Sequence, residues 1–205
     1  VEARLVDLVS GEYAFAKRYR AGVSAAALVA HNLANDLVQV FTGRPGPFLS
    51  RIAFISDRSG ASELWVMDWN GSNPRQLTKH GSIALAPAWG PGGNKLVFTS
   101  FLRGAPALYE LIPQEGYLRQ LWSQGGVNSS ASFSPDGSQV AFASSVDGNT
   151  DIYSISTQGG TARRLTNARA IDTQPAWAPN GRQIAFTSAR AGSPQIFLMD
   201  SDGSN

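Results

Sequence analysis

The chain has 205 residues, of which 42% are hydrophobic and 16% charged, and its formal net charge is +2 at pH 7. It contains no Cys, which excludes a disulfide framework and a thiolate metal site. No run of Lys and Arg indicates nucleic-acid binding, and no apolar run reaches the roughly 18 residues of a membrane span. The 21 Gly and 11 Pro are typical of a turn-rich, mainly β protein.

The first part of the chain contains no repeat and predicts the end of a small α/β domain over residues 1–46. Two strands are expected, over 1–9 and 12–19, on either side of Gly11. The remainder, 47–205, is expected to form a separate domain built from repeats.

A helix is expected over 21–42, with Ser24 as its N-cap and Gly43 as its stop. The Gly-Arg-Pro-Gly-Pro segment after it is unable to continue a helix and predicts a short linker. Polar residues populate one face of the helix. Its apolar face is predicted from residues that recur at helical spacing: Ala26, Ala30, Leu33, Leu37, Val40 and Phe41.

The rest of the chain repeats with a period of 44 residues. Such self-similarity indicates one supersecondary unit copied side by side. An apolar segment of the Arg-Ile-Ala-Phe type opens each copy, at Arg51, Lys95, Gln139 and Gln183. The expected blades are therefore 51–94, 95–138, 139–182 and the start of a further one, 183–205.

Each copy predicts four short strands. The first is the apolar segment, the third is Arg-x-Leu, and the fourth is Pro-Ala-Trp or its variant. The second carries an aromatic residue at a fixed place: Trp65, Tyr109, Tyr153 and Phe197. A turn such as Ser-Pro-Asp-Gly at 134–137 leads to the next copy. Four strands in about 40–50 residues are typical of a β-propeller blade, so the fold is predicted to be a mainly β propeller.

No catalytic residue, metal site or cofactor is predicted. His31 and His80 each stand alone, without a second His or Cys at metal-ligand spacing. Asp136 lies in a turn whose copies carry Gly92 and Asn180, and a catalytic carboxylate would not be interchangeable with Gly. Neither a Gly-x-Ser-x-Gly elbow nor a phosphate-binding loop occurs.

The chain resembles the TolB family of β-propeller proteins. Ahead of the repeats, 1–7 is similar to the last strand region of that family's N-terminal domain, and 30–36 with 41–43 to its final helix. The Ser-Pro-Asp-Gly turns and Arg-x-Leu-Thr strands are similar to its blades. The resemblance implies an α/β domain followed by six blades, of which three and a half would lie in this chain.

The resemblance also implies a non-enzymatic periplasmic scaffold of the Tol–Pal system. Such proteins bind the peptidoglycan-associated lipoprotein Pal through one face of the propeller and contact other Tol proteins. They support outer-membrane integrity and constriction at cell division, and in some bacteria they serve bacteriocin import. A monomer is expected.

In that family the partner contacts lie just upstream of the Pro-Ala-Trp element. Small polar residues there predict a loop, whose residues either contact a partner or merely turn the chain. The family often carries His where Val127 stands. Carried over, the candidate protein-binding residues are Ala86, Val127, Ser130, Asp172, Thr173 and Gln174.

One other function stays open. The repeats are also compatible with the substrate-gating propeller of a prolyl-oligopeptidase-like serine peptidase, whose catalytic domain would lie elsewhere in the protein. A propeller lyase or sugar hydrolase would need acid or metal-ligand sets that the sequence does not supply.

Overall fold

The structure is a computed structural model that describes all 205 residues. The chain divides into two compact units, one of Val1–Ile52 with Met67–Pro74 and the other of Ala53–Val66 with Arg75–Asn205. The expected boundary lay at residues 46 and 47. The first unit therefore also takes in the beginning of the first repeat and one of its hairpins.

In the first unit, β1 (Glu2–Val6) and β2 (Tyr13–Arg18) pair antiparallel, which confirms the two predicted strands. A 3-10 turn, η1 (Val23–Ala25), leads directly into α1 (Ala26–Thr42). No helix in the structure is both long and apolar enough to cross a membrane.

The predicted end of the helix is confirmed, whereas its predicted cap at the start is wrong. Gly43 adopts a left-handed conformation with φ of 73°, and its N–H donates to the carbonyl of Gln39. Ser24 lies inside the 3-10 turn, and α1 begins after Ala25 without a side-chain cap. The tighter turn occupies the residues where a capping serine would have to be extended.

The apolar face of α1 is not the face that packs within this unit. Phe41 is 73% exposed, and Asn35 is the one buried residue of the helix. The Asn35 side chain accepts a hydrogen bond from the Phe48 N–H at 3.0 Å. On the same polar side, Asp36 accepts hydrogen bonds from Tyr19 at 2.5 Å and Lys17 at 2.7 Å. The polar face therefore holds the helix against β2 and the linker.

Fourteen strands follow in the repeats. They are β3 (Arg51–Ser56), β4 (Glu63–Asp68), β5 (Arg75–Gln76), β6 (Ala84–Trp89), β7 (Leu96–Ser100), β8 (Ala107–Ile112), β9 (Tyr117–Trp122), β10 (Asn128–Phe133), β11 (Gln139–Ser144), β12 (Asp151–Ser156), β13 (Arg163–Arg164), β14 (Asp172–Trp177), β15 (Gln183–Ser188) and β16 (Gln195–Asp200). A short 3-10 turn, η2 (Pro91–Gly93), precedes β7.

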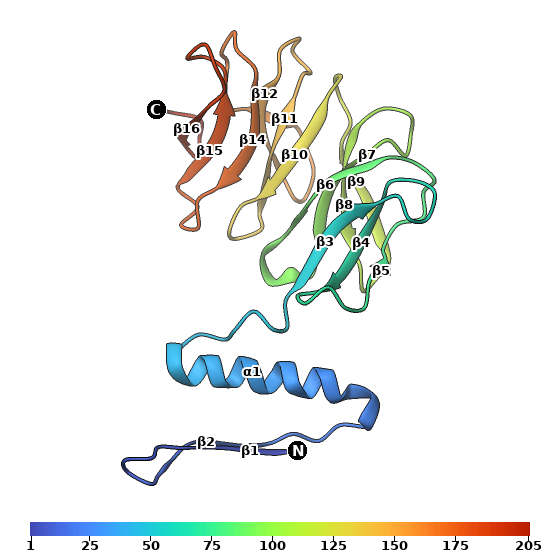
Figure 1. The fold of residues 1–205 in the computed structure, drawn as a ribbon. Coiled ribbons are helices and arrows are strands. Elements are labelled where there is room, and N and C mark those ends of the chain that lie inside the picture. Colours follow the sequence, from blue (N-terminus) through green and yellow to red (C-terminus); the bar gives the residue numbers. More distant parts are fainter. The chain divides into compact units, whose positions relative to one another are not determined.

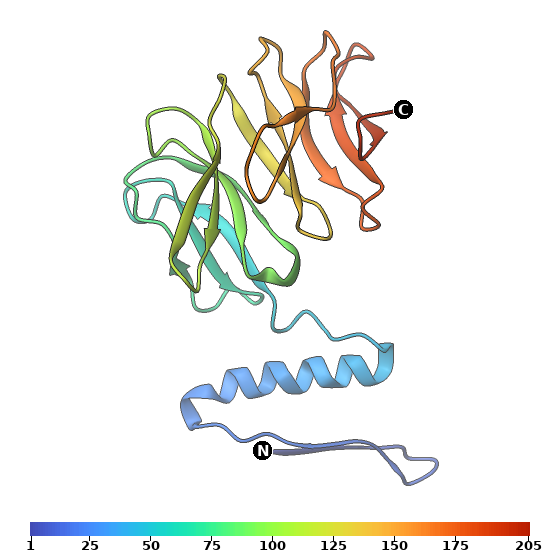
Figure 2. The ribbon, with the colours of Figure 1, turned by 180° about the vertical axis from the view of Figure 1, so that it is seen from behind.

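The strands form antiparallel sheets in the orders β3-β4-β5, β6-β7-β8-β9, β10-β11-β12-β13 and β14-β15-β16. The last three sheets follow one another in Figure 1 and, from behind, in Figure 2. The Pro-Ala-Trp strand therefore opens a sheet instead of closing one, so the sheets begin one strand earlier than the predicted blades. The cause is the tight turn after this strand, which folds it into a hairpin with the next copy, as in the pair Trp89 and Leu96.

The core lies between successive sheets. Apolar side chains of β7, β8 and β9 pack against those of β10, β11 and β12, and an equivalent cluster joins the next pair of sheets. The repeated aromatics take part: the rings of Phe142 and Tyr153 lie 6.0 Å apart. Since each sheet buries its faces against its neighbours, the inner strands β6, β10 and β14 are fixed side by side.

Candidate functional site

The inner strands share a distortion close to their first residues. The pairing register shifts between Leu85 and Ala88 in β6, and the same shift recurs in β10 and β14. In each shift one residue other than glycine has a positive φ: Ala86 at 47°, Ser130 at 54° and Gln174 at 55°. These three β-bulges are spaced by the repeat, so they form one feature presented three times.

The bulges correct the predicted loop and give it a different structure. Residues 84–86, 128–130 and 172–174 belong to strands, not to a loop. A left-handed conformation costs a residue with a side chain about 1–2 kcal/mol, so the surrounding sheet must hold it in place. Bulges re-aim side chains at the edge of a sheet and often lie beside functional sites.

A repeated set of exposed apolar side chains lies beside the bulges. Ile83, Val127 and Ile171 precede β6, β10 and β14 and are 48%, 47% and 58% exposed. Their spacing of 44 residues places one directly before each inner strand, at the same edge of the sheets. We call this surface the binding rim, made of these three residues and the three bulge residues.

Only part of the predicted contact set lies on the binding rim. Ala86, Val127 and Gln174 are exposed, and Ser130 and Thr173 are half-buried. The Gln174 side-chain oxygen accepts a hydrogen bond from Thr187 at 3.2 Å. Ile83 and Ile171 begin the stretches 83–86 and 171–174, in which the family's contacts were expected one repeat on either side of Val127.

Asp172 is completely buried, so its carboxylate is not available on the binding rim. One carboxylate oxygen accepts from the Arg190 guanidinium at 2.8 Å, and the other has no hydrogen-bond partner. Arg190 in turn stacks over Phe186 and Phe197, with ring centres at 5.1 and 5.0 Å. This pair anchors the start of β14 to the hairpin of its own sheet.

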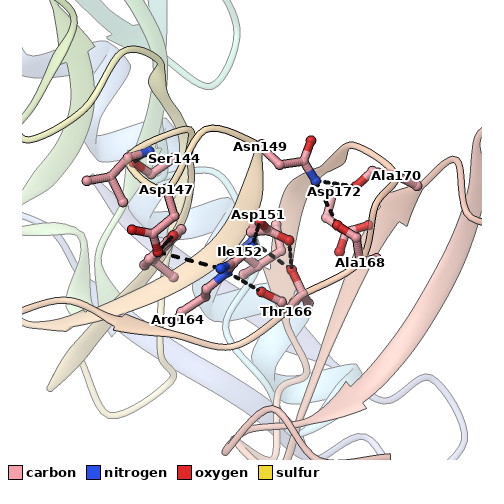
Figure 3. Close-up of polar contacts among 12 residues, drawn as sticks. Ser144, Asp147, Asn149, Asp151, Ile152, Arg164, Thr166, Ala168, Ala170 and Asp172 are labelled. Carbon is pink, nitrogen blue, oxygen red and sulfur yellow. Dashed lines mark hydrogen bonds and ion pairs between the residues drawn. The ribbon is translucent and has the colours of Figure 1, made fainter.

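The side chain of Asn149 holds the segment that leads into β14. Its amide nitrogen donates to the carbonyls of Ala168 at 2.8 Å and Ala170 at 2.9 Å (Figure 3). The Asp172 N–H donates to the Thr150 carbonyl at 2.8 Å. Ile171 lies between these anchors, and its exposed position follows from backbone that is fixed on both sides.

A buried ion pair lies at the start of β12, close to the residues that Asn149 holds. Asp151 is fully buried and accepts from Arg164 at 2.5 Å and from the Thr166 hydroxyl at 3.2 Å (Figure 3). The Thr166 hydroxyl also accepts from the Ile152 N–H at 2.9 Å. In the first repeat Thr78 makes the same two hydrogen bonds, to the Glu63 carboxylate and from the Leu64 N–H. The Thr of the Arg-x-Leu-Thr motif therefore ties the third strand to the start of the second.

Two other side chains considered in the sequence, His31 and Asp136, have local partners. The ring of His31 packs edge-on against Trp69 at 5.8 Å. Asp136 accepts hydrogen bonds from Ser134 at 2.5 Å and from Ser138, which lower its pKa to about 2. No three His, Cys, Asp or Glu side chains gather where a metal ion could be held.

Comparison with known proteins places these features in a family. A family profile described as "TolB beta propeller domain" matches residues 38–205. The protein named "Tol-Pal system protein TolB" of Geobacter metallireducens is 41% identical over 95 residues, which cover 46% of this chain and 22% of that relative.

Solved structures agree with the profile. TolB from Acinetobacter baumannii superposes with a TM-score of 0.87 at 31% identity, over 98% of this chain and 52% of that one. An oligogalacturonate lyase in complex with manganese is more distant, with a TM-score of 0.58 at 27% identity, over 73% of this chain and 44% of the lyase. The chain thus spans about half of the TolB structure that it matches.

Proposed function

The chain belongs to the TolB β-propeller family, and on that premise we propose that it is part of a non-enzymatic periplasmic scaffold of the Tol–Pal system. In this role it binds a Pal-like lipoprotein through the binding rim and works with other Tol proteins. The biological outcome is outer-membrane integrity and constriction at division, with bacteriocin import in some bacteria.

The observation that carries the proposal is the binding rim itself. Ile83, Val127 and Ile171 repeat an exposed β-branched side chain on three neighbouring strands. A soluble protein seldom exposes apolar side chains in register without a partner, because their burial is favourable. The bulges and the anchors beneath them fix the rim before a partner arrives, which lowers the entropic cost of binding.

The candidate residues take different parts in this contact. Val127, Ala86 and Gln174 reach the partner directly, with Ser130 and Thr173 at the edge of the contact. Asp172 acts indirectly, because its pair with Arg190 holds the strand that presents Thr173 and Gln174.

The test is a pull-down from periplasmic extract with the full-length protein and its Val127→Arg, Ser130→Arg and Thr173→Arg variants. The matched control is Gln114→Arg, an exposed position in the turn between β8 and β9 at the opposite edge of the sheet. We expect a Pal-like lipoprotein to be recovered with the control and lost with the Val127, Ser130 and Thr173 variants, since a buried unpaired charge opposes association.

Recovery of that lipoprotein by all variants alike would refute the rim as the contact surface. Recovery of no lipoprotein by the unaltered protein would refute the scaffold. It would then favour the alternative, the substrate-gating propeller of a prolyl-oligopeptidase-like peptidase.

A further inference from the structure

Two equivalent clefts lie at the edge opposite the binding rim, where the turns after the inner strands meet the neighbouring sheets. The first cleft is between the β6–β9 and β10–β13 sheets, and the second is between the β10–β13 and β14–β16 sheets. Each residue position of the second cleft is 44 higher than the equivalent position of the first cleft, so the two clefts can be compared side chain by side chain.

The first cleft is filled by the chain's own lysine. The Lys95 ammonium lies 5.1 Å from the centre of the Phe133 ring and donates to the Gly137 carbonyl at 3.3 Å. It is also 3.6 Å from a carboxylate oxygen of Glu110. An aromatic face, a glycine carbonyl and an acid thus hold one primary ammonium group.

Two further residues complete the filled cleft. A Cβ atom at Gly90 would lie 2.8 Å from the Lys95 Cγ, so the lysine stem needs glycine there. Arg119 pairs with the same Glu110 at 2.7 Å and donates to the Thr157 carbonyl at 2.5 Å.

The second cleft has lost its internal occupant. Gln139 stands at the position of Lys95, Ser134 at that of Gly90, and Ser154 at that of Glu110. The result is an open cavity of about 440 Å³, which lies within the roughly 300–1,000 Å³ of ligand pockets. Trp177 and Gly181 line it at the positions of Phe133 and Gly137.

The charges around this cavity are more negative than positive. Asp136 and Asp202 line it together with a single cation, Arg163. Hydrogen bonds from Ser204, with a smaller contribution from Arg163, keep the pKa of Asp202 below its ordinary value. Both carboxylates are therefore ionised at neutral pH, and Arg163 offsets only one of them.

We propose that the second cleft binds the ammonium group of a lysine side chain from a protein partner. The cavity keeps an aromatic residue and a glycine at the positions that hold Lys95 in the first cleft, and Trp is the best of the aromatic residues for contact with a cation. Asp202 and Asp136 supply the negative charge that Glu110 supplies in the first cleft. This site is additional to the binding rim and lies at the other end of the same strands.

The test follows the indole N–H resonance of Trp177 in the full-length protein, assigned with Trp177→Phe. The indole nitrogen is buried without a hydrogen-bond partner, so its resonance is sensitive to a group entering the cleft. The probes are Nα-acetyl-lysine N-methylamide and the norleucine analogue, which has the same stem without the ammonium group.

The decisive variant is the double change Ser134→Gly with Gln139→Lys, which introduces the glycine and the lysine of the filled cleft into the second cleft. Its reference is Ser134→Gly alone, and thermal melting checks that both remain folded. We expect a saturable shift with the lysine probe only, and an affinity at least tenfold weaker in the double variant than in its reference. Asp202→Asn is expected to weaken binding by about threefold, as for an exposed charge.

Equal shifts with the lysine and norleucine probes would overturn the proposal, because the ammonium group would then contribute nothing. So would the absence of any shift, or equal affinities in the double variant and its reference.

Discussion

Asn128 and Asp172 occupy the same position in neighbouring sheets, but only the Asn128 side chain both donates and accepts hydrogen bonds. Asn128 donates to the carbonyls of Pro106 at 3.0 Å and Gln124 at 3.1 Å. One oxygen of Asp172 accepts a hydrogen bond from Arg190. Between the second pair of sheets Asn149 binds the carbonyl of Ala168, the copy of Gln124. The anchor of the inner strand is thus retained although its chemistry has changed.

Asn128→Asp is expected to destabilise the protein by about 2–4 kcal/mol. The change removes two hydrogen bonds and buries a carboxylate, and the copy of Arg190 at this sheet is Val146, which offers no positive charge. Urea unfolding at neutral pH measures the effect. Asn149→Asp is the matched comparison in a less buried position and should cost less. A variant as stable as the unaltered protein would show that the anchor is unimportant.

Ser130→Gly is expected to stabilise the protein by up to about 1 kcal/mol. Glycine adopts a positive φ without steric penalty, and this gain exceeds its larger loss of backbone entropy. Ser129→Gly is the control, because the same substitution at an ordinary strand position should destabilise by about 0.5–1 kcal/mol. Equal effects at both positions in chemical unfolding would contradict the strained bulge.

Lys95→Gln is expected to destabilise the protein by about 1–2 kcal/mol. It removes the contact with Phe133 and one of the two cations beside the buried Glu110. Arg119 still pairs with that carboxylate, so the loss stays below the roughly 3–5 kcal/mol of an unpaired buried charge. Lys79→Gln, at an exposed position, should change the melting temperature little. Equal melting temperatures of the two variants would show that the Lys95 contacts in the first cleft do not stabilise the protein.

Asp136 predicts a stability change in the acid range. Its pKa is lowered to about 2 by Ser134 and Ser138, against about 3.9 in an unfolded chain. A lowered pKa contributes stability above the unfolded value, and this contribution is lost as the pH falls from about 4 to 2. The difference in free energy of unfolding between the unaltered protein and Asp136→Asn should therefore become smaller as the pH falls over that range. Urea unfolding at several pH values measures it. A difference independent of pH would exclude the ionised carboxylate as the cause.

The 44-residue period made most of the propeller predictable, because each strand carries its own pattern of apolar, aromatic and turn residues. The grouping of strands into sheets was not predictable from the period. A repeat has no beginning of its own, and the Trp89 to Leu96 hairpin that sets the boundary is a matter of backbone pairing. The predicted start of α1 was wrong for a similar reason, because a serine such as Ser24 is favoured both in a helix cap and in a tight turn.

The bulges leave only a weak signal in the amino-acid sequence. Pro87 and Pro175 follow the bulge residues, and proline within a strand is confined to edges and bulges. The copy at Ala131 lacks proline, and none of the bulge residues is glycine, which hid the positive φ values. The burial of Asp172 was equally unpredictable from the sequence. Its partner Arg190 lies 18 positions later, and the preceding copy has Val146 at that place.

The offset between repeat and sheet separates the unit of inheritance from the unit of folding. A gene segment copied from Lys95 to Ser138 would encode three strands of one sheet and the first strand of the next, as β10 shows. The last strand of each added copy then belongs to the following sheet, and the first strand of its own sheet comes from the preceding copy. A segment cut at the sheet boundaries, such as β6 to β9, would therefore keep one sheet whole, whereas a segment cut at the repeat boundaries would remove a hydrogen-bonded strand from the next sheet.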